Sequence, residues 1–144
     1  SFERAPLTDA MVKQALHMAG VGWPQPQLMA TVGSTNDRVL ELATNGAAEG
    51  TSVVAEEQVA GRGRRDRTWV SPPGAGVWCS VLVRAGDVPR DRWALVPIAA
   101  GLAARAAITA AGVSAQLKWP NDVVVETSAG CESWQEFWCK PVVE

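Results

Sequence analysis

The 144-residue chain is predicted to fold as an α+β domain, with a mixed sheet and helices mainly on one face of it. Two patterns predict this class. Segments with the helical spacing of apolar residues alternate with short apolar strands, and some strands follow one another closely enough to pair as hairpins. The composition is the third observation, because 47% hydrophobic residues over this length is typical of one globular domain with a single core.

Three helices are predicted from apolar spacing and from the residues that begin and end them. The first follows Thr8, which is a good capping residue, and the second covers residues 36–44 after Ser34 or Thr35. The third, over residues 91–111, is rich in alanine, and Pro97 is expected in its first turns or at a kink. The predicted ends are Gly20 with Gly22, Asn45 with Gly46, and Gly112.

Five strands are predicted, over residues 27–32, 51–57, 76–84, 114–118 and 123–126. The strand over 76–84 alternates most clearly. Its odd-numbered residues from Val77 to Val83 share one face, and Trp78, Ser80 and Leu82 share the other. Both faces are apolar in part, so both are expected to be partly covered.

Charge, cysteines and hydropathy exclude several classes of function. The net charge of −2 gives no general attraction for nucleic acid, although a local arginine cluster leaves that function open. Three scattered cysteines form neither a disulfide framework nor a zinc site and fit a reducing cytoplasm, and the single histidine, His17, argues against a histidine-based metal site. No segment is expected to span a membrane: residues 94–113 come nearest, but Arg105 interrupts them.

The most informative stretch runs from Gln58 to Trp69. Between Gly61 and Arg67 it holds two glycines and four arginines, and predicted strands lie on both sides. Glycine lets the backbone approach a ligand closely, and the planar guanidinium group suits carboxylate and phosphate. The stretch is predicted to be a loop that binds an anion and closes over it. A solvated basic loop or a nucleic-acid patch explains the same composition.

Two further motifs are ambiguous when each is taken alone. The run Gly33-Ser34-Thr35-Asn36 fits a plain helix cap, and it also fits a polar ligand that faces the free amides of a helix start. The run Lys118-Trp119-Pro120-Asn121-Asp122 follows a predicted strand. Its last residues suit a simple turn as well as they suit a ligand site.

Together and in this order, the three motifs resemble those of biotin–protein ligases, over roughly residues 28–126. The resemblance implies the fold that biotin ligases share with lipoate ligases and class II aminoacyl-tRNA synthetases. It also implies a reaction in two steps. Biotin and ATP, with Mg²⁺, give biotinyl-5′-adenylate and pyrophosphate, and a lysine of a biotin carboxyl carrier protein or domain then attacks the adenylate.

The expected protein is an ATP-dependent, AMP-forming ligase of the cytoplasm, with no nucleic-acid or membrane partner and with a homodimer allowed. Because both reactants of the first step are anions, the enzyme must neutralise their repulsion and hold them in line. By the resemblance, Lys118 is the central cation near the biotin carboxylate and the phosphate, and Arg64 is the catalytic residue of the loop.

The resemblance implies further roles. The residues expected to bind biotin or its adenylate are Ser34, Thr35, Asn36, Gln58, Gly61, Arg62, Gly63, Arg64, Arg67, Trp69 and Lys118. Within this set, Ser34, Thr35 and Gln58 are expected at the ureido ring, and the loop is expected to act as a lid that keeps water from the adenylate. Asn121 and Asp122 are similar to residues on the nucleotide and Mg²⁺ side, and no metal site made by the protein alone is implied.

The sequence departs from the family in two places. Asp66 stands where glycine is common, and its carboxylate is able to pair with a neighbouring arginine and weaken the loop's hold on phosphate. After Asp122 the family's later glycine-containing strands are not found, and an aromatic stripe runs from Trp134 to Trp138 at helical spacing. Residues 1–126 are therefore interpreted as an incomplete ligase-like core and 127–144 as an atypical tail, and ligation by this chain alone is expected to be weak or absent.

Three alternatives stay open. A lipoate ligase or octanoyltransferase has the same fold, but the Arg-Arg-x-Ser-Gly-Gly-Gly pattern of that branch is not found. A nucleic-acid-binding module would use the arginines of the loop, and its affinity would fall steeply with salt. A non-catalytic biotin-binding or interaction fragment would hold biotin or a protein partner without turnover.

Overall fold

The computed structural model describes residues 5–20, 22–62, 68–69, 73–74, 76–86, 88–118, 122–125 and 140–143. The chain divides into two compact units. The first runs from the N-terminus to Arg84 and includes Val142–Glu144, and the second runs from Ala85 to Pro141.

The predicted α+β class with a mixed sheet is confirmed. The helices are α1 (Asp9–Met18), α2 (Thr35–Thr44) and α3 (Val96–Ala110), and a 3₁₀ helix, η2 (Arg90–Leu95), precedes the last. The strands are β1 (Gln27–Val32), β2 (Ser52–Gln58), β3 (Gly61–Arg62), β4 (Thr68–Trp69), β5 (Trp78–Val83), β6 (Ala115–Lys118), β7 (Asp122–Val125) and β8 (Lys140–Val143). The three predicted helices and the five predicted strands each have a counterpart in this set, with ends shifted by a few residues.

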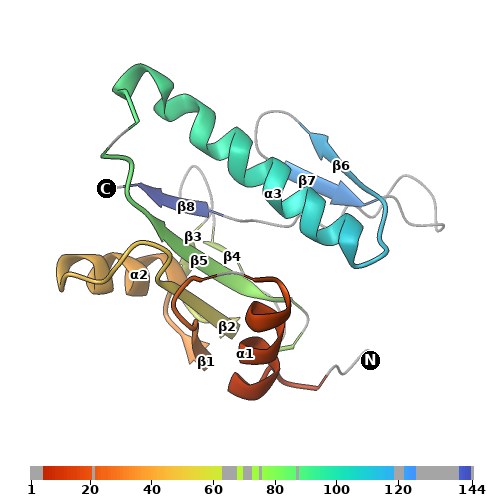
Figure 1. The fold of residues 1–144 in the computed structure, drawn as a ribbon. Coiled ribbons are helices and arrows are strands. Elements are labelled where there is room, and N and C mark those ends of the chain that lie inside the picture. Colours follow the sequence, from red (N-terminus) through yellow and green to blue (C-terminus); the bar gives the residue numbers. More distant parts are fainter. Residues whose placement is uncertain are drawn as a thin grey trace. The chain divides into compact units, whose positions relative to one another are not determined.

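The largest sheet has the strand order β1-β2-β5-β8 (Figure 1). β1 and β2 run parallel, with Val32 beside Gln58, and β2 and β5 run antiparallel, with Val53 beside Ser80. This combination makes the sheet mixed. The fourth strand, β8, was not predicted from the sequence. The predicted helical stripe from Trp134 to Trp138 lies outside the described residues.

The core of the first unit lies between α2 and the sheet. Val39 on α2, Val53 on β2 and Leu82 on β5 are each 0% exposed, and they form one cluster with Ala43, one helical turn after Val39. Burial of each large side chain stabilises the fold by about 1.5–3 kcal/mol. The face of β5 that carries Ser80 and Leu82 is therefore the face that packs against α2.

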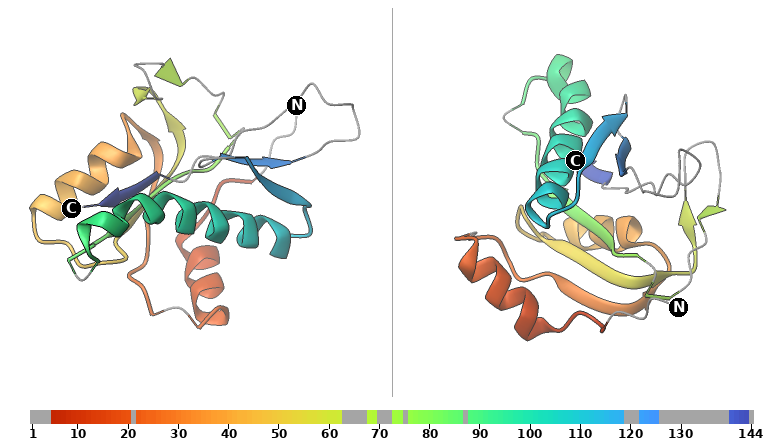
Figure 2. Two further views of the ribbon diagram at one scale, coloured as in Figure 1. Left: turned by 90° about the horizontal axis from the view of Figure 1, so that it is seen from above. Right: turned by 90° about the vertical axis from the view of Figure 1, so that its right-hand side faces the viewer.

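α1 contributes little to this core. Thr8 caps it as predicted, through a hydrogen bond from the backbone N of Met11, but none of its residues is buried. The segment before α1 crosses the other face of the sheet (Figure 2). There the backbone N of Leu7 donates to Glu56 Oε1 at 3.0 Å. α1 thus lies across the sheet from α2.

The second unit pairs α3 with the β6–β7 hairpin (Figure 1). Gly101 is buried at the contact, and a methyl group built on it would lie 3.2 Å from Cδ2 of Leu117, so a larger residue there would crowd β6. Arg105 Nε donates to the carbonyl of Ala115 at 3.0 Å. Pro97 occupies the first turn of α3, as predicted, and the residues before it form the 3₁₀ helix rather than α-helix.

The expectation about membrane segments needs a correction. Among the residues that the structure describes, the stretch Arg90–Ala110 is long and apolar enough to cross a membrane by length and composition alone, with a mean hydropathy of 1.5. The expectation gave too much weight to Arg105, because one charged residue is not enough to make the mean hydropathy of this long apolar stretch low. The same arginine ties the helix to the backbone of β6.

Candidate functional site

The motifs around Ser34 and Gln58 lie side by side, although 23 residues separate Thr35 from Gln58. β1 and β2 are parallel neighbours, and each motif follows the carboxyl end of one of them. The pairing continues beyond the strands, since Val59 N donates to Val32 O at 3.0 Å and Ala60 N donates to Gly33 O at 2.8 Å. The space beyond the carboxyl ends of adjacent strands is where α/β sheets commonly bind ligands.

A buried network of polar side chains joins the two motifs to β5. Gln58 Oε1 accepts hydrogen bonds from the backbone N of Thr35 at 2.8 Å and from Thr35 Oγ1 at 3.0 Å. Thr35 Oγ1 is also 2.9 Å from Ser80 Oγ. Thr35 and Ser80 are 4% and 2% exposed, so the network sits where unpaired polar groups would be costly.

The N-terminus of α2 belongs to the same site. Ser34 is its N-cap, with the hydroxyl oxygen accepting from the backbone N of Asp37 at 3.3 Å, which decides between the two predicted capping residues. Asn36 is half-buried in the first turn. A helix start that combines hydroxyl groups with backbone amides favours a polar or anionic ligand.

The arginine-rich stretch is attached to this site at its first arginine. Gly61 and Arg62 form β3 and pair antiparallel with Thr68 and Trp69 of β4, so the stretch begins and ends in a two-stranded ribbon. Gly61 is buried, whereas Arg62 is exposed and forms an ion pair with Asp37 in the first turn of α2. Exposed pairs of this kind contribute about 0–1 kcal/mol, and a stronger anion can displace them.

The motif at Lys118 closes the hairpin of the second unit. Lys118 ends β6 and Asp122 begins β7, and the two residues are register partners. The Lys118 side chain is exposed and Asp122 is half-buried. The hairpin therefore holds a cation and a carboxylate at the same end, on strands whose other end is anchored by Arg105 at Ala115.

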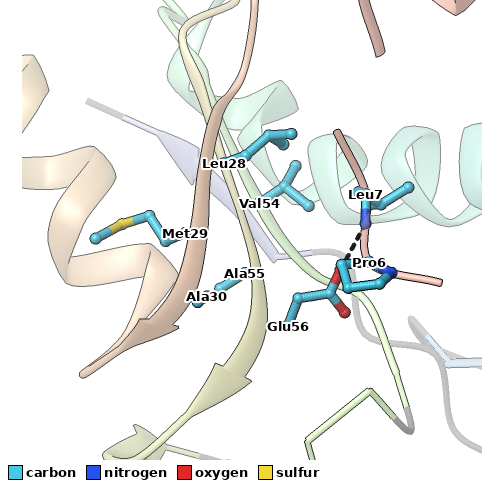
Figure 3. A pocket seen from close by; sticks show the side chains of 8 residues that line it. All are labelled: Pro6, Leu7, Leu28, Met29, Ala30, Val54, Ala55 and Glu56. Atoms are coloured by element: carbon cyan, nitrogen blue, oxygen red, sulfur yellow. Dashed lines mark hydrogen bonds between the residues drawn. The ribbon is translucent and has the colours of Figure 1, made fainter. Parts of the chain in front are cut away.

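A shallow pocket of about 180 Å³ lies elsewhere, on the face of β1 and β2 that turns away from α2 (Figure 3). Leu28, Val54 and Glu56 point toward Leu7 across it, whereas Met29 points the other way and packs against the core under α2. The pocket contains none of the predicted site residues. It is also smaller than the roughly 300–1,000 Å³ of most small-molecule sites. It is therefore not the candidate site.

A sequence model for the "Biotin/lipoate A/B protein ligase family" matches residues 28–130, a range that contains all three motifs. The chain belongs to this family. The match confirms the resemblance that the three motifs carry.

Known relatives agree with this membership. The biotin--[acetyl-CoA-carboxylase] ligase of Mycobacterium tuberculosis is 40% identical over 126 residues, which are 84% of this chain and 47% of the relative. Two solved structures also match. Biotin protein ligase from Leishmania major, in complex with biotinyl-5-AMP, has a TM-score of 0.61 and 29% identity over 71% of this chain and 47% of that one. Biotin protein ligase from Aquifex aeolicus, in complex with biotin and ATP, has a TM-score of 0.56 and 32% identity over 68% of this chain and 40% of that one.

The chain spans less than half of the length of each of these three proteins. As a member of the biotin/lipoate ligase family it nevertheless contains the stretches that the sequence analysis singled out. Of the predicted site residues, the structure brings together Ser34, Thr35, Asn36, Gln58, Gly61 and Arg62 in the first unit, and Lys118 with Asp122 in the second. Gly63, Arg64, Arg67, Asn121 and the side chain of Trp69 lie outside the described residues.

A magnesium ion is implied by the family's chemistry rather than by a cluster of ligands. Within the described residues, no group of three or more His, Cys, Asp or Glu side chains is arranged to hold a metal. Mg²⁺ at nucleotide sites usually takes one or two carboxylates and the phosphates of the substrate, so Asp122 alone is enough to fit such an ion.

Two residues of β5 were placed on one strand face from the sequence but were not assigned to the site. Ser80 completes the network with Thr35, and Trp78, two residues earlier, has a buried indole Nε1 with no hydrogen-bond partner within the described residues. The signal for Ser80 was present, because a hydroxyl between Trp78 and Leu82 on the same strand face is a polar group at a core position. Its partner could not be read from the sequence, since 45 residues separate Ser80 from Thr35.

Proposed function

We propose that the chain provides the biotin- and ATP-binding part of a biotin–protein ligase. In the first step an oxygen of the biotin carboxylate attacks the α-phosphorus of ATP, and pyrophosphate leaves as biotinyl-5′-adenylate forms. In the second step the amine of an acceptor lysine attacks the carbonyl carbon of the adenylate, an amide bond forms, and AMP leaves.

One observation carries the proposal. The hydrogen bonds between Thr35 and Gln58, together with the backbone bond from Ala60 to Gly33, join two family motifs at the carboxyl ends of parallel strands. Biotin's ureido ring offers one carbonyl acceptor and two N–H donors. A rigid set of amide and hydroxyl groups suits that ring better than it suits an anion.

The charged residues serve the other end of biotin. A carboxylate and a triphosphate repel each other, so the reaction needs cations close to both. Arg62, which pairs with Asp37, and the further loop arginines Arg64 and Arg67 are proposed to bind the adenylate phosphate and close over it. Lys118 is proposed to neutralise the carboxylate and the α-phosphate as a compact point charge.

The remaining partners follow from the same chemistry. Asp122, with Asn121, would hold Mg²⁺ on the nucleotide side, and the ion would neutralise phosphate charge there. The acceptor is proposed to be a lysine of a biotin carboxyl carrier domain, and the location is proposed to be the cytoplasm. The proposal allows a homodimer and includes no nucleic-acid or membrane partner.

A lipoate or octanoate substrate is the second candidate, because the matching family model covers both branches. Lipoate has no ureido ring, so it would leave the Nε2 group of Gln58, whose oxygen is already paired with Thr35, without a partner. Buried polar groups left unpaired lower affinity strongly, and a site of this kind discriminates against ligands that lack the matching group.

Calorimetry with three ligands tests the proposal. A non-hydrolysable biotinyl-5′-adenylate analogue is expected to bind more tightly than biotin, because it engages the arginines as well as the polar network. Lipoate is expected to give no heat. Binding of lipoate without binding of biotin would assign the chain to the other branch, and binding of neither with retained binding of single-stranded nucleic acid would replace the proposal altogether.

A further inference from the structure

Ser80 is a polar residue in an apolar place. It lies on β5 opposite Val53, two residues from Leu82, and both of these neighbours are 0% exposed. A hydroxyl in such a position destabilises a fold unless it is hydrogen-bonded. Ser80 Oγ lies 2.9 Å from Thr35 Oγ1. The residue therefore belongs to the polar network, and its position there affects which hydrogen-bond donors and acceptors the network presents to a ligand.

The direction of each hydrogen bond follows from the donors. The backbone N of Thr35 can only donate, so the atom of the Gln58 carboxamide that faces it must be the oxygen. That oxygen carries no proton, so the hydroxyl of Thr35 donates to it as well. Thr35 has then used its single proton, and Ser80 must be the donor in the contact between the two hydroxyl groups.

This order of donors fixes the carboxamide of Gln58. Its oxygen accepts two hydrogen bonds from Thr35, and within the described residues its Nε2 group has no partner. Threonine in a helix has two common side-chain rotamers. The bond from Ser80 selects the rotamer that aims the Thr35 hydroxyl at Gln58, so it helps to keep the carboxamide oxygen paired with Thr35 and the Nε2 protons available to a ligand.

We propose that Ser80 is a positioning residue that acts through Thr35 on Gln58, so that the site offers N–H donors, and not an acceptor, to the carbonyl oxygen of a cyclic urea. The inference rests on the proposed function and deepens it. By this proposal, one buried hydroxyl on β5 helps to determine that the site presents hydrogen-bond donors to the carbonyl oxygen of the ureido group. Ser80 itself touches neither the ligand nor the reacting atoms.

The test compares biotin with 2-iminobiotin at neutral pH, where the guanidine group that replaces the urea is protonated and presents N–H donors in place of the ureido carbonyl oxygen. The unmodified chain is expected to prefer biotin, because the Nε2 protons of Gln58 need an acceptor. In Ser80→Ala the Thr35 hydroxyl is no longer fixed on Gln58, and the backbone N of Thr35 is the one donor that still holds the carboxamide oxygen. The carboxamide is then less ordered, so biotin affinity is expected to fall about tenfold, the effect of one good hydrogen bond, while the affinity for 2-iminobiotin stays constant or rises. General destabilisation would weaken both ligands together.

Ser52→Ala is the matched control. Ser52 is also a buried strand serine, 6% exposed, in the same sheet, and it has no part in the network. This variant is expected to keep the ratio of the two affinities. A Ser80→Ala chain that keeps the ratio as well would overturn the proposal.

A second measurement needs no ligand. Hydrogen exchange of the Thr35 backbone N–H, followed by NMR, is expected to become faster in Ser80→Ala than in Ser52→Ala at equal global stability, because its acceptor on Gln58 is less ordered. Unchanged exchange would overturn the positioning role. Faster exchange in a chain that binds neither biotin nor 2-iminobiotin would instead overturn the proposed function and leave the effect of Ser80 on Thr35 standing.

Discussion

Among the described glycines, Gly50 is the one that combines a left-handed backbone with a close side-chain neighbour. Its φ is +81°, a left-handed value that L side chains rarely adopt, and it is buried beneath the indole of Trp23. A Cβ built on Gly50 would lie 2.9 Å from Cγ of Trp23. Its backbone N donates to Leu82 O at 2.9 Å, so this turn links the start of β2 to the end of β5.

Gly50→Ala is expected to destabilise the chain by about 2–4 kcal/mol, from the left-handed backbone together with the collision with Trp23. Gly46→Ala is the matched control, since Gly46 has the same φ of +81° and a Cβ there would meet nothing within 4 Å. In that variant the free energy of unfolding is expected to fall only by the cost of the left-handed backbone, about 1–2 kcal/mol. Urea unfolding measures both free energies.

A third variant separates the two contributions. In a Trp23→Ala background the collision is gone, so Gly50→Ala is expected to be no more damaging than Gly46→Ala. Equal losses for the two glycine variants in the unmodified chain would show that Trp23 moves aside without cost, which its 54% exposure permits in principle.

At the level of single residues, some members of the site could be identified from the sequence and others could not. Ser34, Thr35 and Gln58 could be found because they stand in local motifs with recognisable neighbours. Ser80 could not be assigned, because its role depends on the register that brings β5 opposite Val53. The ion pair between Arg62 and Asp37 was also out of reach, since it joins two motifs that were analysed separately.

Elements, in contrast, were predicted well where a local pattern defines them. The apolar spacing within α2 and the alternation within β5 both correspond to faces that the structure buries. The long helix was predicted as one piece because 3₁₀ and α-helices share similar apolar spacing, and the backbone begins it as η2 instead. β8 was missed because its pairing with the sheet is not local.

The cap of α2 gives a prediction at this scale. Ser34→Ala is expected to reduce the free energy of unfolding by about 1 kcal/mol, because α2 carries Val39 into the core and loses its side-chain acceptor at the N-terminus. Thr8→Ala removes the same kind of cap from α1, which has no buried residues, and is expected to fray that helix with little effect on global unfolding. Urea titrations followed by tryptophan fluorescence distinguish the two.

Ser34→Gly extends this comparison to function. Glycine is a good N-cap, so the stability loss is expected to be only a few tenths of a kcal/mol. The hydroxyl proposed to face the ureido ring is absent from both variants, so both are expected to weaken biotin binding. Normal biotin affinity in Ser34→Gly would reduce Ser34 to a helix cap.

For the molecule as a whole, the proposed function depends on local charge rather than on net charge. The chain carries −2 overall, yet its two family motifs with cations, one containing Arg62 and one containing Lys118, fall in different units of the fold. General attraction of anions is therefore weak, and the proposed chemistry requires specific side chains from both halves of the sequence. Such a protein should respond very differently to the loss of different lysines.

Lys118→Ala is expected to lower biotin-dependent exchange of pyrophosphate into ATP by a factor on the order of a hundred, as when a single transition-state donor is removed. Lys13 is the matched control, because it is an exposed lysine on α1, which has no buried residues. Lys13→Ala removes the same net charge and should leave exchange unchanged.

Lys118→Arg keeps the charge but presents a broad planar donor, so we expect partial activity from it. If Lys118→Ala and Lys13→Ala exchanged pyrophosphate equally fast, charge neutralisation at the end of β6 would have no part in the reaction, and the cation would have to come from the arginine-rich stretch alone.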